Sequence, residues 1–237
     1  MFFHERYVTV KKRVDLPAVT VSYAQTLDGR LATTSGSSQW ISSPESLRFA
    51  HALRAKHDTI MVGAGTAWKD DPRLTVRLLP GKDPLRVVAD STLRTPITAA
   101  VLANGAAAGT VLAVTENAPA DRCAEAHSLG ATVLRLPANT KGRADLPSLL
   151  FELRALSVGS VLVEGGAALI TALLCDRLVT RLAVCVAPKI LGSGIEAVGD
   201  LGICDFSHTL RLTDTSVTAY GVNLVLDSRV EYTNYTP

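Results

Sequence analysis

Cysteine is scarce in this chain, and the few cysteines are not arranged for a disulfide framework or a zinc site. The 237 residues include only Cys123, Cys175, Cys185 and Cys204, and no two of them stand in a C-x-x-C pair. The five histidines show no ligand spacing either. Scattered thiols of this kind are typical of buried cysteines in a cytosolic protein. We therefore expect no metal, no disulfide and a cytoplasmic location.

An excess of charge of either sign is also missing, as is a long apolar run. The 24 basic and 22 acidic side chains leave a net charge of +2, which gives no electrostatic case for nucleic acid or a membrane surface. No apolar run approaches the ~20 residues that span a bilayer. The start, MFFHERYVTVKKRV, lacks the apolar core of a signal peptide. We expect neither nucleic acid nor a membrane as a partner.

Hydrophobic residues, in contrast, are abundant and account for 47% of the chain. This is enough for one sizeable domain. Neither an internal repeat nor a low-complexity linker divides the sequence. We therefore expect a single domain over residues 1–237, with a core from about 18 to 226 and an N-terminal extension over 1–17.

Short apolar runs alternate with helical patterns along the chain. The runs are continuously apolar, as in strands that are covered on both faces of a parallel sheet. The end, residues 209–232, indicates two or three strands with no helix between them. This order predicts an α/β sandwich with a mostly parallel sheet and a C-terminal antiparallel hairpin at its edge. The predicted strands are 18–24, 59–65, 85–91, 110–116, 131–137, 160–166 and 181–191, and the predicted helices are 43–58, 118–130, 145–159 and 166–178.

The stretch SVLVEGG ends a predicted strand in a carboxylate, Glu164, directly before Gly165 and Gly166. Ligands of open parallel sheets bind beyond the carboxyl ends of the strands. Glycines there allow backbone N–H groups to approach a ligand, and the following helix N-terminus favours an anion such as a pyrophosphate. A tight turn without a ligand is the alternative. Because a carboxylate does not suit a pyrophosphate, Glu164 indicates a second ligand with donor groups.

The helix predicted over 43–58 carries an arginine where an apolar residue is expected. Ser43 suits the N-cap and Pro44 the first helical position. Leu47, Ala50 and Leu53 share a face by spacing, and Arg54, seven residues after Leu47, falls on that same face. A guanidinium in that place needs a partner. The Arg54 guanidinium can form a structural ion pair or bind a phosphate through two N–H groups, and the sequence leaves both alternatives open.

Two further segments are candidates for chemistry. The segment from Gly63 to Arg77 follows a strand and contains Asp70, a neighbouring aspartate, Pro72 and two arginines, which we treat as a loop. Adjacent carboxylates in a loop are most often solvated, but this combination of residues favours a binding role. The pair Asp28-Gly29 predicts a turn.

These segments, in this order, resemble the reductase of bacterial riboflavin biosynthesis, which has the dihydrofolate-reductase-like fold. The resemblance runs from about 18 to 226 through TLDGR, SGSSQWISSPE, RAKHDTIMVGAGTAWKDDPRLTVR, DSTLRTP, VEGG and PKILGSG. It implies a three-layer sandwich, a homodimer, and hydride transfer from NADPH to C1′ of the ribose of a phosphoribosylamino-pyrimidine. The bacterial enzymes usually carry a zinc deaminase domain first. No H-x-E followed by P-C-x-x-C occurs here, so we expect a reductase-type domain that stands alone.

The resemblance also implies roles for individual residues. Asp70 and Glu164 would be catalytic, and Asp70 would stabilise the protonated C=N group of the opened ribosylamine. The pyrimidine or ribose would lie against Glu164. The other substrate contacts would be Ser38, Arg54, Leu74 and Arg77. The cofactor contacts would be Ala24, Trp40, Thr66, Asp70, Ser91, Gly165, Gly166, Ala167, Ala168 and Leu169.

The segment ADSTLRTP favours NADPH over NADH. Ser91 and Arg94 suit a 2′-phosphate, whereas Asp90 opposes one if it points inward. Another feature departs from the bacterial enzymes, which usually carry a lysine where this chain has Ser22. A short neutral side chain there predicts reduction of the diamino-pyrimidine at least as well as of the deaminated form. Two alternatives stay open, namely another substrate such as dihydrofolate and a binding protein without chemistry.

Overall fold

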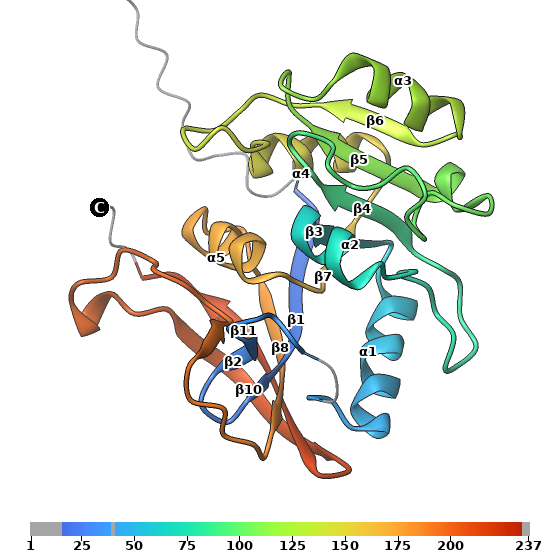
Figure 1. Cartoon of the computed structure of the whole chain (residues 1–237). Helices are drawn as coiled ribbons and strands as arrows, with labels where there is room; N and C mark the ends of the chain where they lie inside the picture. The colour runs from blue at the N-terminus through green and yellow to red at the C-terminus, as the bar shows by residue number, and fades with distance from the viewer. Residues whose placement is uncertain (1–15, 39–40, 234–237) are drawn as a thin grey trace, which may run out of the picture.

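The computed structural model describes residues 16–38 and 41–233, and its core is a nine-stranded sheet (Figure 1). The strand order across this sheet is β10-β11-β8-β1-β7-β3-β4-β5-β6. Every pairing from β8 to β6 is parallel, and β11 pairs antiparallel with both β8 and β10. The nine strands are β1 (Ala18–Thr26), β3 (Thr59–Gly63), β4 (Leu85–Ala89), β5 (Thr110–Val114), β6 (Thr132–Arg135), β7 (Ser160–Val163), β8 (Arg181–Ala187), β10 (Arg211–Tyr220) and β11 (Asn223–Glu231).

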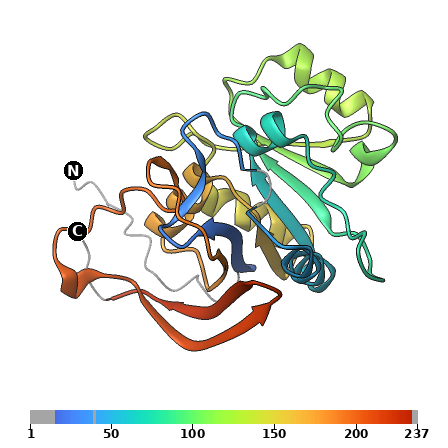
Figure 2. The ribbon, with the colours of Figure 1, turned by 60° about the horizontal axis from the view of Figure 1, so that its bottom comes forward.

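The C-terminal hairpin forms as the sequence predicts. In Figure 2, β10 and β11 run as one long hairpin along the edge of the molecule. The turn at Gly221 has φ +63°, which favours glycine. Most of β10 is exposed, so its outer face is covered by no other described part of the chain.

Helices cover both faces of the parallel part, which makes the three-layer sandwich that the resemblance implies. On one face, α4 (Leu146–Ala155) and α5 (Ala167–Cys175) pack against alternate residues of the strands, such as Val19 and Met61. On the other face, Ile60 and Val62 pack with α2 (Ala64–Asp70) and α3 (Ala120–Ser128). Alternate residues of one strand therefore enter different cores, which explains the continuous apolar runs.

The helix α1 (Pro44–Lys56) begins as predicted, with Ser43 as its N-cap and Pro44 in its first turn. The expectation of an apolar buried face is wrong. Leu47 is 45% exposed, and the buried residues of α1 are Ser46 and His51. The reason is that this helix faces a polar part of the molecule, where Arg54 lies, rather than an apolar core.

Three elements were not expected, a short helix and two short strands. The segment after Gly63, where the sequence predicts a loop, forms the short helix α2, and its C-cap is Asp71 with φ +40°. A small second sheet joins β2 (Arg30–Thr33) to β9 (Gly194–Glu196). The turn predicted at Asp28-Gly29 is confirmed, and it leads from β1 into β2. The Asp28 carboxylate accepts from the backbone N–H groups of Leu191 and Gly192, which ties the two halves of this small sheet together.

All four cysteines are free, but only two of them are buried. Cys123 and Cys185 lie in the interior, whereas Cys175 and Cys204 are exposed, contrary to the expectation of buried thiols. Cys175 is exposed because it ends α5 at the surface, and Cys204 lies in a segment without helix or strand, after β9.

Candidate active site

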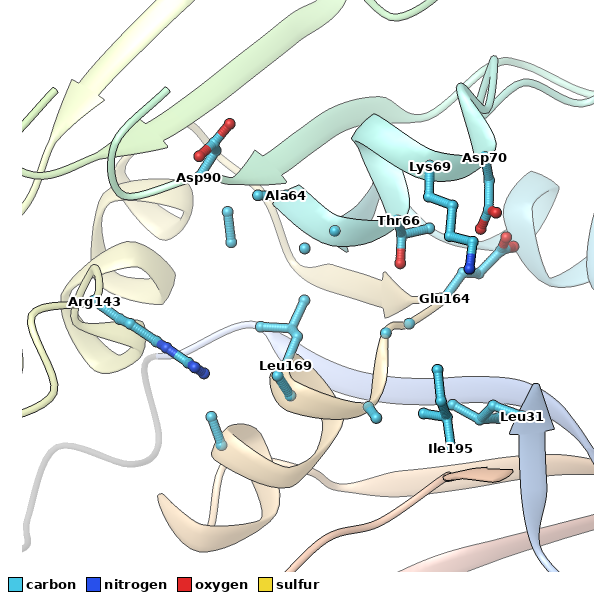
Figure 3. Close-up of a pocket in the computed structure, with 18 of the residues that line it drawn as sticks. Leu31, Ala64, Thr66, Lys69, Asp70, Asp90, Arg143, Glu164, Leu169 and Ile195 are labelled. Carbon is cyan, nitrogen blue, oxygen red and sulfur yellow. The ribbon is translucent and has the colours of Figure 1, made fainter. Parts of the chain in front are cut away.

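A cavity of about 670 Å³ opens at the carboxyl ends of β1, β3, β4 and β7, the place that the parallel sheet predicts. Its charged groups fall into two sets in Figure 3. Asp90 and Arg143 lie at one end, and Lys69, Asp70 and Glu164 lie at the other. The N-terminus of α5 lies between them and carries the glycine pair. The volume of this cavity lies within the usual range for ligand sites.

Most residues that the sequence singled out line this cavity. Of the remainder, Arg54, Leu74 and Arg77 do not line it, and Trp40 lies outside the described residues. The lining residues from the predicted set are Ala24, Ser38, Thr66, Asp70, Ser91, Glu164, Gly165, Gly166, Ala167, Ala168 and Leu169.

The glycine pair forms the tightly packed turn that leads into the N-terminus of α5. Gly165 has φ +116°, a backbone conformation that side chains with a Cβ avoid, and the Gly165–Gly166 peptide bond is cis. Gly166 is the N-cap of α5, with no side chain to cap the helix. A Cβ at Gly166 would lie 3.1 Å from Thr66 Oγ1. Free backbone N–H groups at this N-terminus and the helix dipole make it suitable for an anion in the cavity.

Glu164 and Arg54 form a bidentate ion pair at the other end. Arg54 Nε donates to Glu164 Oε1 at 2.7 Å, and Nη2 donates to Oε2 at 2.6 Å. Arg54 Nη1 also donates to the carbonyl of Thr75 at 2.9 Å. The two charged side chains are only 13% and 15% exposed. Arg54 therefore has the partner that its inward position demands, and this partner is a residue of the cavity wall.

Arg77 lies in the segment after α2 and close to the same pair. Its backbone N–H donates to His51 Nδ1 at 2.9 Å, and its Nη1 donates to Thr75 Oγ1 at 2.9 Å. Burial lowers the pKa of Arg77, and the nearby charges of Arg54 and Arg73 lower it further. The carboxylates of Asp83 and Glu164 act in the opposite direction, so Arg77 lies in a mixed cluster of cations and anions.

Leu74, the remaining predicted substrate contact, is 1% exposed and packs in the core beside Ile60 and Val88. Its side chain is therefore part of the interior and does not reach the cavity. The segment backbone turns at this residue, which has φ +54°.

Asp70 ends α2 and faces the cavity. Burial raises the pKa of its carboxyl group, and the neighbouring Lys69 opposes this shift. No hydrogen bond ties the Asp70 side chain to another residue within 16–38 or 41–233. It is thus a partly desolvated carboxyl group that is free to meet a ligand.

At the opposite end, the side chain of Asp90 points inward, the orientation that opposes a 2′-phosphate. It is 1% exposed, and its Oδ2 accepts from the backbone N–H and the hydroxyl of Thr95. Its Oδ1 has no partner among the described residues. Ser91 Oγ accepts from the backbone N–H of Ala144, so this serine fastens the segment that carries Arg143.

Arg143, Lys69 and Tyr23 line the cavity but were not proposed from the sequence. Arg143 lies in the polar segment after β6 and could have been found by the rule that led to the other post-strand segments. Lys69 was not predicted to face the cavity, because the sequence predicts a loop where α2 forms. Tyr23 is in β1, and burial raises its pKa to about 12, so its hydroxyl stays protonated at neutral pH.

Within residues 16–38 and 41–233, no three His, Cys, Asp or Glu side chains gather into a group that could hold a metal ion. In the same part of the chain, none of the helices combines the length and the apolar character needed to cross a membrane.

Comparison with known proteins gives the same picture. The model of the family "RibD C-terminal domain" matches residues 17–226. The chain is 41% identical over 223 residues to a protein of Methanothermobacter thermautotrophicus named 2,5-diamino-6-ribosylamino-4(3H)-pyrimidinone 5′-phosphate reductase. The aligned region covers 92% of this chain and 98% of that protein. It is 39% identical over 221 residues to riboflavin biosynthesis protein RibD of Aquifex aeolicus, which covers 93% of this chain.

The chain spans 58% of the length of that Aquifex protein. Among solved structures, RibD of Acinetobacter baumannii superimposes with a TM-score of 0.79 at 27% identity, over 92% of this chain and 58% of the other. The range that the family model matches, residues 17–226, contains the glycine pair, Arg54, Glu164 and Asp70 of this chain. This chain therefore belongs to the RibD C-terminal domain family.

Proposed function

We propose that this protein is an NADPH-dependent reductase that transfers hydride to C1′ of the ribose of a 5-phosphoribosylamino-pyrimidine in riboflavin biosynthesis. The observation that carries the proposal is the division of one cavity into two ends. The middle of the cavity offers backbone N–H groups at the start of α5, and one end offers the carboxylates of Asp70 and Glu164, the latter paired with the Arg54 guanidinium. The named activity of the Methanothermobacter relative supports this assignment.

The residues present fit a dinucleotide cofactor. Its pyrophosphate would lie against Gly165, Gly166 and the first turn of α5, and bound NADPH would supply the hydride that reduces C1′. The small side chains of Ala167 and Ala168 leave room for it. The protein's part is to hold the two ligands in line and to exclude water.

The substrate would occupy the other end. The Glu164 carboxylate can accept from the donor groups of a pyrimidine while Arg54 holds it in place. A phosphate would lie near Arg54 and Arg77, whose mutual repulsion an anion relieves. Asp70 would stabilise the cationic C=N group of the opened ribosylamine through its charge.

The choice of NADPH over NADH rests on the end of the cavity that holds Arg143. The cations Arg94 and Arg143 both line this end and favour a 2′-phosphate. Asp90 weighs against it, because its unpartnered Oδ1 accepts rather than donates. We propose that attraction of the 2′-phosphate to Arg94 and Arg143 outweighs its repulsion by Asp90, so that NADPH binds more tightly than NADH.

The form of the pyrimidine is a separate question. Ser22 lies in β1, is 8% exposed and is not part of the cavity lining. A substrate bound in this cavity would therefore not contact Ser22 directly. The proposal that the diamino-pyrimidine is reduced at least as well as the deaminated form is supported by the name of the Methanothermobacter relative.

The decisive experiment follows NADPH oxidation with both phosphoribosylamino-pyrimidines, at fixed cofactor. We expect oxidation with at least one of them and none with dihydrofolate, which lacks the phosphate that Arg54 and Arg77 suit. A tenfold preference in kcat/KM for the deaminated pyrimidine, about 1.4 kcal/mol in transition-state binding, would contradict the proposed preference. No oxidation with either compound would leave a binding protein as the better assignment.

We also propose a homodimer. The outer hairpin leaves apolar side chains exposed on β10 and β11, including Leu212 at 42%, Val217 at 59% and Leu224 at 50%. Exposed edges of this kind are usually covered. Light scattering at micromolar concentration should give twice the monomer mass of 25.1 kDa, and a monomer mass would reject the dimer.

A further inference from the structure

His51 is a buried histidine next to the proposed substrate end, and the proposed mechanism does not use it. It lies in α1, three residues before Arg54, and is 5% exposed. Its Nδ1 accepts a hydrogen bond from the backbone N–H of Arg77 at 2.9 Å. It thus joins α1 to the segment that follows α2, across 26 residues of sequence.

The direction of this hydrogen bond fixes the state of the imidazole. A backbone N–H group can only donate, so His51 Nδ1 must be unprotonated. The neutral ring therefore carries its proton on Nε2. An imidazolium has N–H groups at both positions and cannot accept this bond. Protonation of His51 and the link to Arg77 exclude each other.

The surroundings of His51 favour the neutral form. Burial lowers its pKa most, the charges of Arg54 and Arg77 lower it further, and Glu164 acts in the opposite direction. A third cation here would repel both arginines. Below the ordinary histidine range, protonation would add that charge and break the link to Arg77 together.

The link has a consequence for the two arginines. The guanidinium of Arg54 is held by Glu164 and by the carbonyl of Thr75, and that of Arg77 is held by the hydroxyl of the same Thr75. The position of the segment Thr75 to Arg77 relative to α1 therefore decides how the two cations lie toward each other. The His51 bond is one of the contacts that set this position.

We propose that neutral His51 is a positioning residue, which fastens the Arg77 segment to α1 so that Arg54 and Arg77 hold one anionic group of the substrate together. Its protonation releases the segment and weakens the hold on that anion. The inference rests on the proposed function in one respect, since it takes the anion to be the phosphate of the substrate.

Two substitutions separate the parts of this inference. His51→Asn keeps an acceptor near the place of Nδ1 but cannot be protonated, whereas His51→Leu removes the acceptor and keeps the site apolar. For His51→Leu we expect KM for the phosphorylated pyrimidine to rise by about tenfold, as loss of a buried hydrogen bond allows, with KM for NADPH unchanged. His51→Asn should stay close to the parent at neutral pH.

The pH profile is the sharper readout. For the parent, KM for the substrate should rise as pH falls below the ordinary histidine range. For His51→Asn this rise should be smaller, leaving only the part caused by the substrate phosphate, whose second pKa is about 6. Equal acid limbs in the two proteins, or an unchanged substrate KM in His51→Leu, would overturn the proposal. If His51→Leu does not fold, the comparison of the parent with His51→Asn still decides.

A measurement that needs no activity separates this inference from the proposed function. Two-bond ¹⁵N–¹H correlation spectra distinguish histidine tautomers. His51 should carry its proton on Nε2, whereas His57 serves as an internal control with the opposite tautomer, because its Nδ1 lies 2.7 Å from the carbonyl of Leu53 and must donate. Inorganic phosphate should shift the His51 signals more than those of His57.

A proton on Nδ1 of His51 would overturn the inference even if the protein reduces the pyrimidine. The expected tautomer and phosphate response without any reductase activity would keep the positioning role and reject the proposed reaction instead.

Discussion

The two ends of the cavity solve the problem of binding a polar ligand in different ways. At the end with Glu164, this carboxylate is held by Arg54 in a bidentate ion pair that is largely buried. At the end with Arg143, this cation lines the cavity, and Oδ1 of the buried Asp90 has no partner among the described residues.

This difference follows from what each end has to recognise. Buried charges are costly unless they are paired, which accounts for the fixed partnership of Arg54 and Glu164. A pyrophosphate is recognised by backbone N–H groups, which need close approach and no side chains. The end with Glu164 therefore depends on specific side chains, and the middle of the cavity depends on the absence of side chains at Gly165 and Gly166.

The largest effect should come from breaking the paired end. Arg54→Ala leaves the Glu164 carboxylate buried without its partner, so the free energy of unfolding should fall by about 3 kcal/mol. Substrate binding should weaken by roughly 1.5–3 kcal/mol if the arginine also holds a phosphate, while NADPH still binds. Chemical denaturation and separate titrations of the two ligands measure these effects.

Arg181→Ala is the matched control for Arg54→Ala. Arg181 binds Asp227 with the same bidentate geometry, at 2.6 and 2.8 Å, but it is 46% exposed and lies away from the cavity. Its loss should cost at most about 1 kcal/mol of stability. Equal losses in both variants would mean that burial of the Arg54 pair has no special weight.

Asp70→Asn should lower turnover by about a hundredfold, the effect of a lost catalytic charge or proton-transfer group, while both ligands still bind. Steady-state kinetics with binding titrations test this. Asp71→Asn is the neighbouring control, because Asp71 faces away and its Oδ1, which an asparagine retains, accepts from the backbone N–H of Ala100. Unchanged turnover in Asp70→Asn would remove Asp70 from the mechanism.

The same Asp70 variant should be more thermostable than the parent at neutral pH. Burial raises the pKa of Asp70, so folding disfavours its charged form. The stability linked to this group is present below its unfolded pKa and is lost as pH rises through its folded pKa. Asparagine removes that loss, so calorimetry should show a higher Tm at pH 7 and little difference near pH 3. A lower Tm at pH 7 would contradict the desolvation argument.

The smallest effect should appear at the end with Arg143. Arg143→Ala should weaken the affinity for NADPH by about tenfold, through the loss of one charge-assisted contact. The affinity for NADH should stay the same, because only NADPH carries the 2′-phosphate. Titration of both cofactors measures the ratio. Lys141→Ala is the control, since Lys141 belongs to the same segment but does not line the cavity. Equal losses for NADPH and NADH would show that Arg143 does not select the cofactor.

Much of the cavity could be predicted because it depends on local order along the chain. Glu164 and the glycine pair follow a strand, so the rule for parallel sheets places them at the ligand edge whatever the rest of the fold does. The same rule applies to Ser91 and, had it been used after β6, to Arg143. Lys69 was missed because the seven residues of α2, AGTAWKD, are too few to show a clear helical pattern.

The partners of the charged residues could not be predicted in this way. Arg54 and Glu164 are 110 residues apart, and either an ion pair or a phosphate fork satisfied the sequence. The spacing argument for Arg54 led to an inward position for the wrong reason, since Leu47 on the same predicted face is exposed. The substrate role expected for Leu74 met a side chain that is buried in the core.

The sequence by itself determined the alternation of strand and helix, the C-terminal hairpin, the glycine entrance to α5 and the family, because periodicity and motif order are properties of neighbouring residues. Only the tertiary structure decided that His51 accepts from Arg77, that Arg54 grips Glu164 and that Asp90 keeps a free oxygen. The physical reason is that burial and hydrogen bonding depend on which distant segments meet, and both the charge state and the available partners of a polar group follow from that meeting.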